Sequence, residues 1–252
     1  MPLMKDRCCI VTGGAGSLGQ ASAERFLKEG AKVLLVDHLS EDLERAREAL
    51  QSSDVLIATA DVADARQTEN YVKQAVEAWG RVDVLFSNAG VSGTNAPVTD
   101  YPEDLFDEVM SVNVKGTFLA CKYVLPHMSP GGSIVVTSSI MGVQARPNSV
   151  GYITSKHAIV GFVRCLSREM APKNIRVNAI APGPIDNGFQ KTIEDRMSKT
   201  MGRDATAMLN EIIPLGRHAQ VEEIAQTVLF LASEQSSFST GSVFMADGGW
   251  HA

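Results

Sequence analysis

Short apolar runs rich in Val, Ile and Leu alternate along this chain with longer segments that have the periodicity of helices. These runs lie at 8–12, 32–37, 55–61, 82–88, 132–139, 175–183 and 242–249. Strands that are buried on both faces have this continuous apolar character, and parallel strands need a crossover helix between them. The alternation therefore predicts an α/β protein in which a parallel sheet is covered by helices on both faces.

The segments between the apolar runs predict the covering helices. They lie at about 17–29, 40–50, a stretch that ends near 79, 102–128, 153–170 and 222–233. No linker or low-complexity tract divides the sequence. Residues 1–252 are therefore predicted to form a single domain.

The composition argues against several classes of function. A net charge of −6 and a pI near 5.4 disfavour a surface for nucleic acid or for an anionic membrane. No apolar run reaches the roughly 18 residues of a membrane span, and the N-terminus lacks the apolar core of a signal peptide. The four cysteines have neither metal-ligand nor disulfide spacing, so we expect reduced thiols, no metal site and a cytoplasmic protein.

A glycine-rich segment, "VTGGAGSLG" at 11–19, lies between the first predicted strand and the first predicted helix. Gly14, Gly16 and Gly19 satisfy the G-x-G-x-x-G spacing in the strand–turn–helix context that this motif requires. The glycines permit close approach of a pyrophosphate, and the helix N-terminus supplies free N–H groups. The segment predicts a dinucleotide site; the alternative is a glycine-rich turn without a ligand.

Asp37 ends the second predicted strand. A carboxylate at this position can bind both ribose hydroxyls of an adenosine and repels a 2′-phosphate. A like-charge pair at about 4 Å costs about 4 kcal/mol at an effective dielectric of about 20. We therefore expect NAD to be preferred over NADP, although a protonated His38 would weaken the repulsion. An Asp that caps a turn at the strand end is the alternative.

Polar residues also follow the third and fourth predicted strands. Asp61 with Val62 is a candidate contact for the adenine, and Asn88, Ala89 and Gly90 follow the next strand. Open α/β sheets bind ligands at the carboxyl ends of their parallel strands, so we expect both groups to contact the cofactor. Helix caps or turn residues are the alternative for each.

Tyr152 and Lys156 are four residues apart in "YITSK". On a helix this spacing puts both side chains on one face, one turn apart. A nearby ammonium group favours the phenolate, so we expect Lys156 to lower the pKa of Tyr152 and make it usable as an acid and a base. The alternative is two solvated residues on a helix surface.

Together these motifs resemble the short-chain dehydrogenase/reductase (SDR) family over essentially the whole chain. The landmarks are Thr12-Gly13 with Gly19, Asp61, Asn88-Ala89-Gly90, Asn113, Ser139, Tyr152, Lys156, Asn178, Pro182-Gly183 and Asp247-Gly248-Gly249. Their order and spacing are far more specific than any single motif. The resemblance implies a Rossmann-like three-layer sandwich with a parallel seven-stranded sheet, a nicotinamide cofactor and a homotetramer.

The resemblance also implies four catalytic residues. Tyr152 acts as acid and base on the substrate oxygen, and Lys156 lowers its pKa and binds the nicotinamide ribose. Ser139 hydrogen-bonds the reacting carbonyl or alkoxide. Asn113 helps to hold a water that relays protons from Lys156 to solvent; the alternative is an Asn satisfied by a buried backbone group.

The cofactor contacts that the resemblance implies come from several strand ends. They are Gly13, Ser17, Leu18, Gly19, Asp37, His38, Asp61, Val62, Asn88, Ala89, Gly90, Tyr152, Lys156, Pro182, Gly183, Ile185 and Asn187. Two of them depart from the family pattern. Ser17 takes the middle glycine position of T-G-x-x-x-G-x-G, where its hydroxyl is available to a phosphate. Asn187 stands where the family often has a Thr that contacts the nicotinamide carboxamide.

Residues 186–214 correspond to the mobile substrate lid of the family. The candidate pocket residues are Ser92, Ser139, Met141, Gln144, Tyr152 and Phe189. Their mixed character predicts a small, neutral, moderately apolar alcohol or ketone. No pair of basic side chains is obviously aimed at a carboxylate, although Arg146 and Arg203 stay open as candidates.

Three functions are compatible with these features. The first is an NAD-dependent secondary alcohol dehydrogenase or ketone reductase, with a hydride passing to or from the nicotinamide C4. The second is a 3-oxoacyl-[acyl-carrier-protein] reductase, which usually uses NADPH, so Asp37 counts against it. The third is a non-catalytic NAD-binding sensor, against which Ser139, Tyr152 and Lys156 argue.

Overall fold

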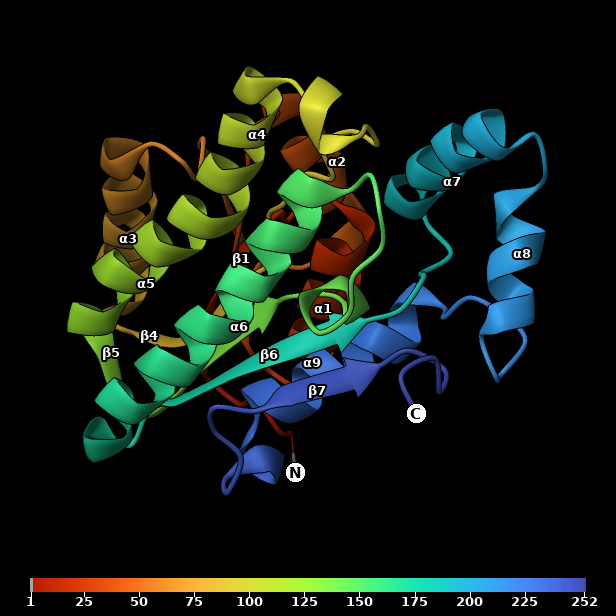
Figure 1. Cartoon of the computed structure of the whole chain (residues 1–252). Coiled ribbons are helices and arrows are strands. Elements are labelled where there is room, and N and C mark those ends of the chain that lie inside the picture. Colours follow the sequence, from red (N-terminus) through yellow and green to blue (C-terminus); the bar gives the residue numbers. More distant parts are fainter. Residues whose placement is uncertain (1) are drawn as a thin grey trace.

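A seven-stranded sheet lies between two layers of helices in the computed structural model, which describes residues 2–252 (Figure 1). The strands are β1 (Cys8–Thr12), β2 (Lys32–Asp37), β3 (Val55–Thr59), β4 (Val82–Ser87), β5 (Met128–Thr137), β6 (Arg176–Pro182) and β7 (Val243–Ala246). All neighbouring strands are parallel, in the order β3-β2-β1-β4-β5-β6-β7. The predicted α/β fold, a Rossmann-like three-layer sandwich, is confirmed.

Helices occupy the connections between the strands, as the sequence predicts. They are α1 (Ser17–Lys28), α2 (Ser40–Leu50), α3 (Ala65–Trp79), α4 (Glu103–Met110), α5 (Gly116–Val124), α6 (Val150–Met170), α7 (Gly188–Met201), α8 (Ala205–Ile212) and α9 (Val221–Ala232). One face of the sheet is covered by α1, α2 and α9, and the other by α3, α5 and α6. Within residues 2–252 no helix has the length and apolar character to cross a membrane.

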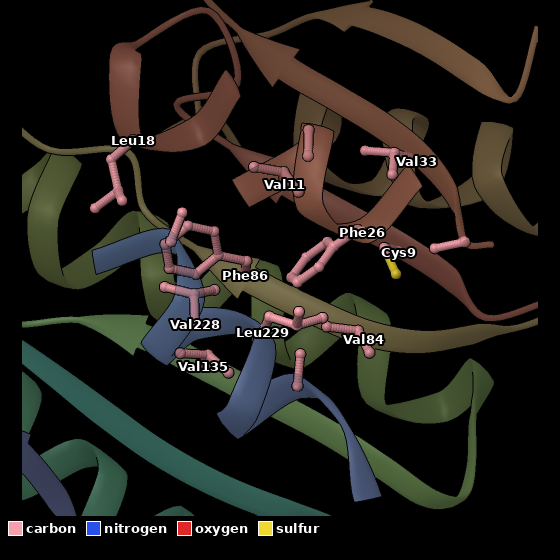
Figure 2. Packing of buried hydrophobic residues seen from close by; sticks show 14 of the residues in the cluster. Cys9, Val11, Leu18, Phe26, Val33, Val84, Phe86, Val135, Val228 and Leu229 are labelled. Atoms are coloured by element: carbon pink, nitrogen blue, oxygen red, sulfur yellow. The ribbon is translucent and has the colours of Figure 1, made fainter. Parts of the chain in front are cut away.

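The apolar layer between the sheet and helices α1 and α9 is shown in Figure 2. Phe26 of α1 and Val228 of α9 point toward the sheet, where they meet Phe86 and Val135 of the central strands. All four side chains are buried. Each buried side chain of this size contributes about 1.5–3 kcal/mol, so this layer fixes the strands whose ends carry the candidate site.

The helix predicted over 102–128 is present as a continuous helical segment from Glu103 to His127, but it is not α-helical throughout. A π-helical segment at Ser111–Lys115 separates α4 from α5, and a short 3₁₀ turn with Pro126 follows α5. Proline has no N–H and clashes with the preceding turn, so the α-helix gives way to a 3₁₀ turn that ends at His127. Strand β5 then begins at Met128 instead of at 132, and it ends at Thr137, before Ser139.

The strand order reverses between β1 and β4. The chain passes from β1 outward to β2 and β3, and then crosses to β4 on the other side of β1. All carboxyl ends lie along one edge because the sheet is parallel. A crevice at such a reversal is where open α/β sheets bind their ligands, and the predicted site residues follow these strand ends.

Candidate active site

The loop after β1 packs tightly against the first turn of α1. Gly13 has a φ of +64°, and a Cβ added to Gly19 would lie 2.1 Å from the carbonyl oxygen of Gly13. Only glycine permits this approach at position 19. The N-cap of α1 is Gly16, and no side chain caps the first N–H groups of the helix. These N–H groups and the helix dipole suit a pyrophosphate, so the loop fits the phosphates of a dinucleotide.

We expect Gly19→Ala to weaken NADH binding by about 10-fold or more, because relieving the clash with Gly13 costs roughly 1–3 kcal/mol and displaces the loop. Fluorescence titration with NADH measures the affinity, and thermal unfolding shows whether the fold is kept. The matched control is Gly161→Ala on α6, where an added Cβ has no heavy atom within 4 Å. Equal NADH affinity in wild type and Gly19→Ala would exclude a phosphate site at this loop.

The two positions that depart from the family pattern contact each other. Asn187 Nδ2 donates to Ser17 Oγ over 3.1 Å, while Asn187 Oδ1 accepts from the N–H of Gln190 and caps α7. The start of α7 is thereby tied to the start of α1. The expected contacts of Ser17 with a phosphate and of Asn187 with the nicotinamide carboxamide stay predictions.

Asp37 lies at the end of β2 beside the glycine loop. Its Oδ2 accepts from the Ala15 N–H over 3.0 Å, and its Oδ1 accepts from the His38 N–H over 2.8 Å. The His38 Nδ1 is 2.9 Å from the same Oδ1. The turn-capping role of Asp37 is therefore present. A carboxylate accepts several hydrogen bonds, so binding of ribose hydroxyls is compatible with this role.

Side-chain hydrogen bonds join the ends of β1, β4 and β5. The N–H groups of Asn88 and Ala89 donate to Thr12 Oγ1 over 3.0 and 3.2 Å, and Thr137 Oγ1 donates to Asn88 Oδ1 over 3.0 Å. A Cβ added to Gly90 would lie 3.1 Å from Oδ1 of the buried Asn113. The segment after β4 is thus fixed beside the glycine loop. The role of Thr137 was not predicted.

Asp61 and Val62 follow β3 and differ in their environments. Asp61 is exposed, and its Oδ1 accepts from the Ala63 N–H over 2.9 Å in a turn. Val62 is buried against Gly116, where an added Cβ would lie 2.9 Å from Val62 Cγ2. The turn role left open for Asp61 is present, and the adenine contact stays a prediction.

The segment after β6 runs beside the end of β7. The Gly183 N–H donates to the Ala246 carbonyl over 3.0 Å, and a Cβ added to Gly183 would lie 2.9 Å from Asp247 Cα. Ile185 forms a bridge with Ala219. Pro182 and Gly183 therefore form a tightly packed backbone wall at the same edge of the sheet as the glycine loop.

Helix α6 presents Tyr152 and Lys156 on one face, as their spacing predicts. The Lys156 Nζ lies 5.6 Å from the centre of the Tyr152 ring and donates to the Thr137 carbonyl over 2.8 Å. Lys156 is only 5% exposed, and this burial lowers the pKa of its ammonium group to about 8. Lys156 is therefore buried and held to the end of β5, and Tyr152 lies half-buried beside it.

The pKa of Tyr152 shifts in the direction opposite to the prediction. Burial raises it above its ordinary value, and hydrogen bonding with Ser139 and the charge of Arg146 offset this only in part. Desolvation disfavours the phenolate as it disfavours the ammonium group of Lys156. The expected net lowering of the Tyr152 pKa is therefore wrong for the protein chain without a bound cofactor.

Ser139 lies just beyond β5, next to Tyr152. It is 9% exposed, and its Oγ accepts from the Met141 N–H over 3.1 Å at the start of a 3₁₀ turn. The hydroxyl hydrogen is free to donate, since the Oγ acts as the acceptor in this contact. The Ser139 hydroxyl is thus available as a donor beside the phenol.

Asn113 lies in the π-helical segment and is 2% exposed. Its Oδ1 accepts from the Val91 N–H over 2.8 Å, and its Nδ2 donates to the Val91 carbonyl over 3.0 Å and to Ser155 Oγ over 2.9 Å. The structural role left open for Asn113 is therefore present. Short π-helical segments are rare in proteins, and those that occur are often at functional sites. The water relay at Asn113 stays a prediction.

A cleft opens beside Tyr152. Its lining residues are Ser92, Gly93, Thr94, Asn95, Arg146, Ser149, Tyr152, Ile193 and Arg196. Ser92 and Tyr152 were predicted pocket residues, whereas Ser139 and Met141 do not line this cleft, although Ser139 lies beside Tyr152. Gln144 instead contacts His251, with 2.7 Å between its Nε2 and the His Nδ1, and Phe189 is 43% exposed on α7.

Residues 186–214 form α7 and α8, which lie outside the two helix layers (Figure 1). Glu194 of α7 is buried and accepts hydrogen bonds from Gln190 Nε2 over 2.7 Å and from Thr206 Oγ1 of α8. The His218 Nε2 lies 2.6 Å from Glu194 Oε1. Burial alone would raise the pKa of Glu194, but these three hydrogen bonds lower it overall. One buried carboxylate thus holds both lid helices and the segment after them.

We expect Glu194→Ala to weaken the lid by about 2–3 kcal/mol, because the buried donors around it lose a charged acceptor. The effect should be local, so it appears as faster trypsin cleavage within 186–214. Glu211→Ala, which removes an exposed carboxylate from α8, is the control. A cleavage rate that is the same in Glu194→Ala and wild type would contradict this role of Glu194.

The fold and the site place this chain among known oxidoreductases. Residues 13–251 match the sequence model of a family described as enoyl-(acyl carrier protein) reductase. The levodione reductase of Leifsonia aquatica is 37% identical, with 98% of this chain and 95% of the relative covered. The 3-oxoacyl-[acyl-carrier-protein] reductase FabG of Thermotoga maritima is 36% identical, with 98% of each covered.

Solved structures agree with the sequence relatives. The crystal structure of levodione reductase has a TM-score of 0.94 at 36% identity, with 98% of each chain covered. A 3-ketoacyl-(acyl-carrier-protein) reductase from Brucella melitensis, complexed with NADH, has a TM-score of 0.89 at 27% identity, with 99% of this chain and 100% of that chain covered. The chain belongs to the SDR family, and it is an SDR oxidoreductase.

Proposed function

We propose that this protein is an NAD-dependent secondary alcohol dehydrogenase or ketone reductase. The observation that carries the proposal is the convergence of Ser139, Tyr152 and Lys156 beside one cleft, with Lys156 Nζ at 5.6 Å from the Tyr152 ring. The names of the relatives span several substrates, so the reaction type is more strongly supported than any particular substrate.

A bound nicotinamide supplies or accepts the hydride. The chain's residues manage the oxygen and the proton: Tyr152 gives or takes a proton at the substrate oxygen, and Ser139 Oγ donates a hydrogen bond to that oxygen. Lys156 would hold the nicotinamide ribose and, with a water at Asn113, relay the proton to solvent. The other residues that would hold the cofactor are Gly13, Ser17, Leu18, Gly19, Asp37, His38, Asp61, Val62, Asn88, Ala89, Gly90, Pro182, Gly183, Ile185 and Asn187.

The proposal is tested by following NADH absorbance with a panel of cyclic and acyclic secondary alcohols and the corresponding ketones. We expect reversible turnover with NAD and much slower turnover with NADP. Tight NADH binding without turnover of any alcohol or ketone would contradict the proposal and favour an NAD-binding sensor.

A 3-oxoacyl-[acyl-carrier-protein] reductase is the second candidate, because relatives of 36% and 27% identity carry that description. Asp37 counts against it where NADPH is the reductant. Acetoacetyl-CoA separates the two candidates: faster reduction of this thioester with NADPH than of simple ketones with NADH would favour the second.

We further propose a homotetramer in the cytoplasm. Phe118 on α5 is 48% exposed, which supports an apolar interface on the α5 and α6 layer. The four cysteines are free, which suits a reducing compartment, and the net charge of −6 supports neither nucleic acid nor membrane as a partner. Light scattering tests the tetramer, and a monomer at assay concentrations would contradict it.

A further inference from the structure

Two arginine side chains line the cleft beside Tyr152. Arg146 lies on the loop before α6, and Arg196 lies on the lid helix α7. The cleft contains no acidic lining residue; the remaining lining residues apart from Tyr152 are Ser92, Gly93, Thr94, Asn95, Ser149 and Ile193. The wall next to the proposed acid/base is therefore positively charged.

A chain of hydrogen bonds orients Arg146. Its Nε donates to Ser149 Oγ over 3.2 Å, and Ser149 Oγ donates to Asn95 Oδ1 over 2.9 Å. Ser149 is 4% exposed, so this chain is anchored inside the protein. The Nη1 faces the thioether sulfur of Met197 at 3.3 Å, which is a weak acceptor. Within residues 2–252 the Nη2 of Arg146 has no hydrogen-bond acceptor.

Arg196 connects the lid to the loop after β4, which also lines the cleft. Its Nη1 donates to the carbonyl of Gly93, in the loop after β4, over 2.6 Å. A guanidinium has several further N–H groups, and those of Arg196 have no acceptor in the described chain. Arg196 thus brings both a lid contact and unused donors to the cleft.

Neither arginine has a carboxylate partner. The ion pairs of residues 2–252 include no pair with Arg146 or Arg196. Arg146 is half-buried, and that burial lowers its pKa. Arg196 is exposed, so the argument from burial applies to Arg146 alone. Removing a charge from water costs free energy unless an opposite charge is near, so the unpaired Arg146 beside Tyr152 favours a ligand that supplies this charge.

We infer that the substrate is a hydroxy acid or oxo acid whose carboxylate is bound by Arg146 and Arg196 while its reacting oxygen lies at Tyr152. This rests on the proposed function and replaces the neutral substrate expected from the sequence. The planar fork of a guanidinium matches the two oxygens of a carboxylate. Arg203 is excluded from this role, because it does not line the cleft and its Nη2 instead contacts the sulfur of Met208.

The position of Arg196 also connects carboxylate binding with the lid. Arg196 lies on α7 and Arg146 lies on the loop before α6. A carboxylate bound by both arginines therefore links the lid helix to the part of the chain that carries Tyr152.

The test uses acids paired with their methyl esters, which share a shape and differ in charge: 2-hydroxybutyrate, 3-hydroxybutyrate and 4-hydroxypentanoate. The readout is the acid-to-ester ratio of kcat/KM with NAD. Wild type should prefer the acid, and Arg146→Gln and Arg196→Gln should each lower the ratio by roughly 10- to 100-fold, the loss expected for a hydrogen bond to a charged group. Arg203→Gln, with the same charge change in the same lid, should keep the wild-type ratio.

The outcomes separate the inference from the proposed function. Turnover of the esters without preference for the acids, or an unchanged ratio in Arg146→Gln, overturns the inference and leaves the proposed function standing. Absence of turnover with every alcohol and ketone overturns the proposed function.

In that case a binding assay still tests whether the two arginines bind a carboxylate. Butyrate should bind the NADH-loaded protein more tightly than butyramide does, and Arg146→Gln should abolish this difference in affinity. Equal binding of the two probes to wild type overturns the site.

Discussion

Tyr152→Phe is expected to bind NADH with the affinity of the wild type and to lose turnover by about three powers of ten. The substitution removes only the hydroxyl, so the ring that packs in α6 near Lys156 stays in place. General acid–base catalysis contributes roughly 10²- to 10⁴-fold, and the variant loses all of it. Fluorescence titration measures NADH binding, and NADH absorbance measures turnover with the best substrate of the panel.

The matched control is Tyr123→Phe. Tyr123 also has a lysine over its ring, with Lys122 Nζ at 5.4 Å from the ring centre, but it lies on α5 and does not line the cleft. It should keep full turnover. Near-normal turnover of Tyr152→Phe would remove this residue from its catalytic role, and loss of NADH binding would mean that the variant perturbs more than the proton transfer.

The positions of the strands and their alternation with helices could be predicted because their signals are local. Each buried strand is a continuous apolar run, and the glycine loop is recognisable from its strand–turn–helix context. The helical segment over 102–128 could also be predicted, because its apolar pattern is continuous. Its π-helical and 3₁₀ parts could not be predicted, because a periodicity argument does not distinguish types of helix and overlooks the effect of Pro126.

Contacts between distant segments could not be predicted in the same way. Asn187 contacts Ser17 at a sequence separation of 170 residues, and Arg196 contacts Gly93 at a separation of 103. Neither pair has a local pattern that indicates the partner. The resemblance to the SDR family gave Ser17 and Asn187 separate expected contacts with the cofactor. It could not show that these two residues, which both differ from the family pattern, contact each other.

The prediction about the Tyr152 pKa was wrong for a related reason. Spacing on a helix predicts that a lysine lies near a tyrosine, but the pKa also depends on how much water surrounds both groups. Burial is a property of the folded chain, and here it raises the pKa of Tyr152 and lowers that of Lys156. The sequence also gives no sign that Arg146, six residues before Tyr152, faces the phenol and partly offsets the effect of burial.

The second large effect is expected at Asp37, where Asp37→Ala should narrow the preference for NADH over NADPH by about two powers of ten. Repulsion between the carboxylate and a 2′-phosphate amounts to about 4 kcal/mol at about 4 Å and an effective dielectric of about 20, and salt reduces it. Affinities for NADH and NADPH are measured by fluorescence at fixed ionic strength, so the result does not depend on knowing the substrate.

Asp37 also accepts the Ala15 N–H of the glycine loop, so Asp37→Ala should weaken binding of both cofactors as well as narrow the preference. Asp37→Asn separates the two effects, because the amide oxygen can still accept from Ala15 while the charge is gone. We expect it to narrow the preference with a smaller loss of NADH affinity. Asp54→Asn, which removes an exposed charge before β3, should leave the preference unchanged. If the ratio of the two affinities stays at the wild-type value in both Asp37 variants, Asp37 acts only as the cap of the glycine loop.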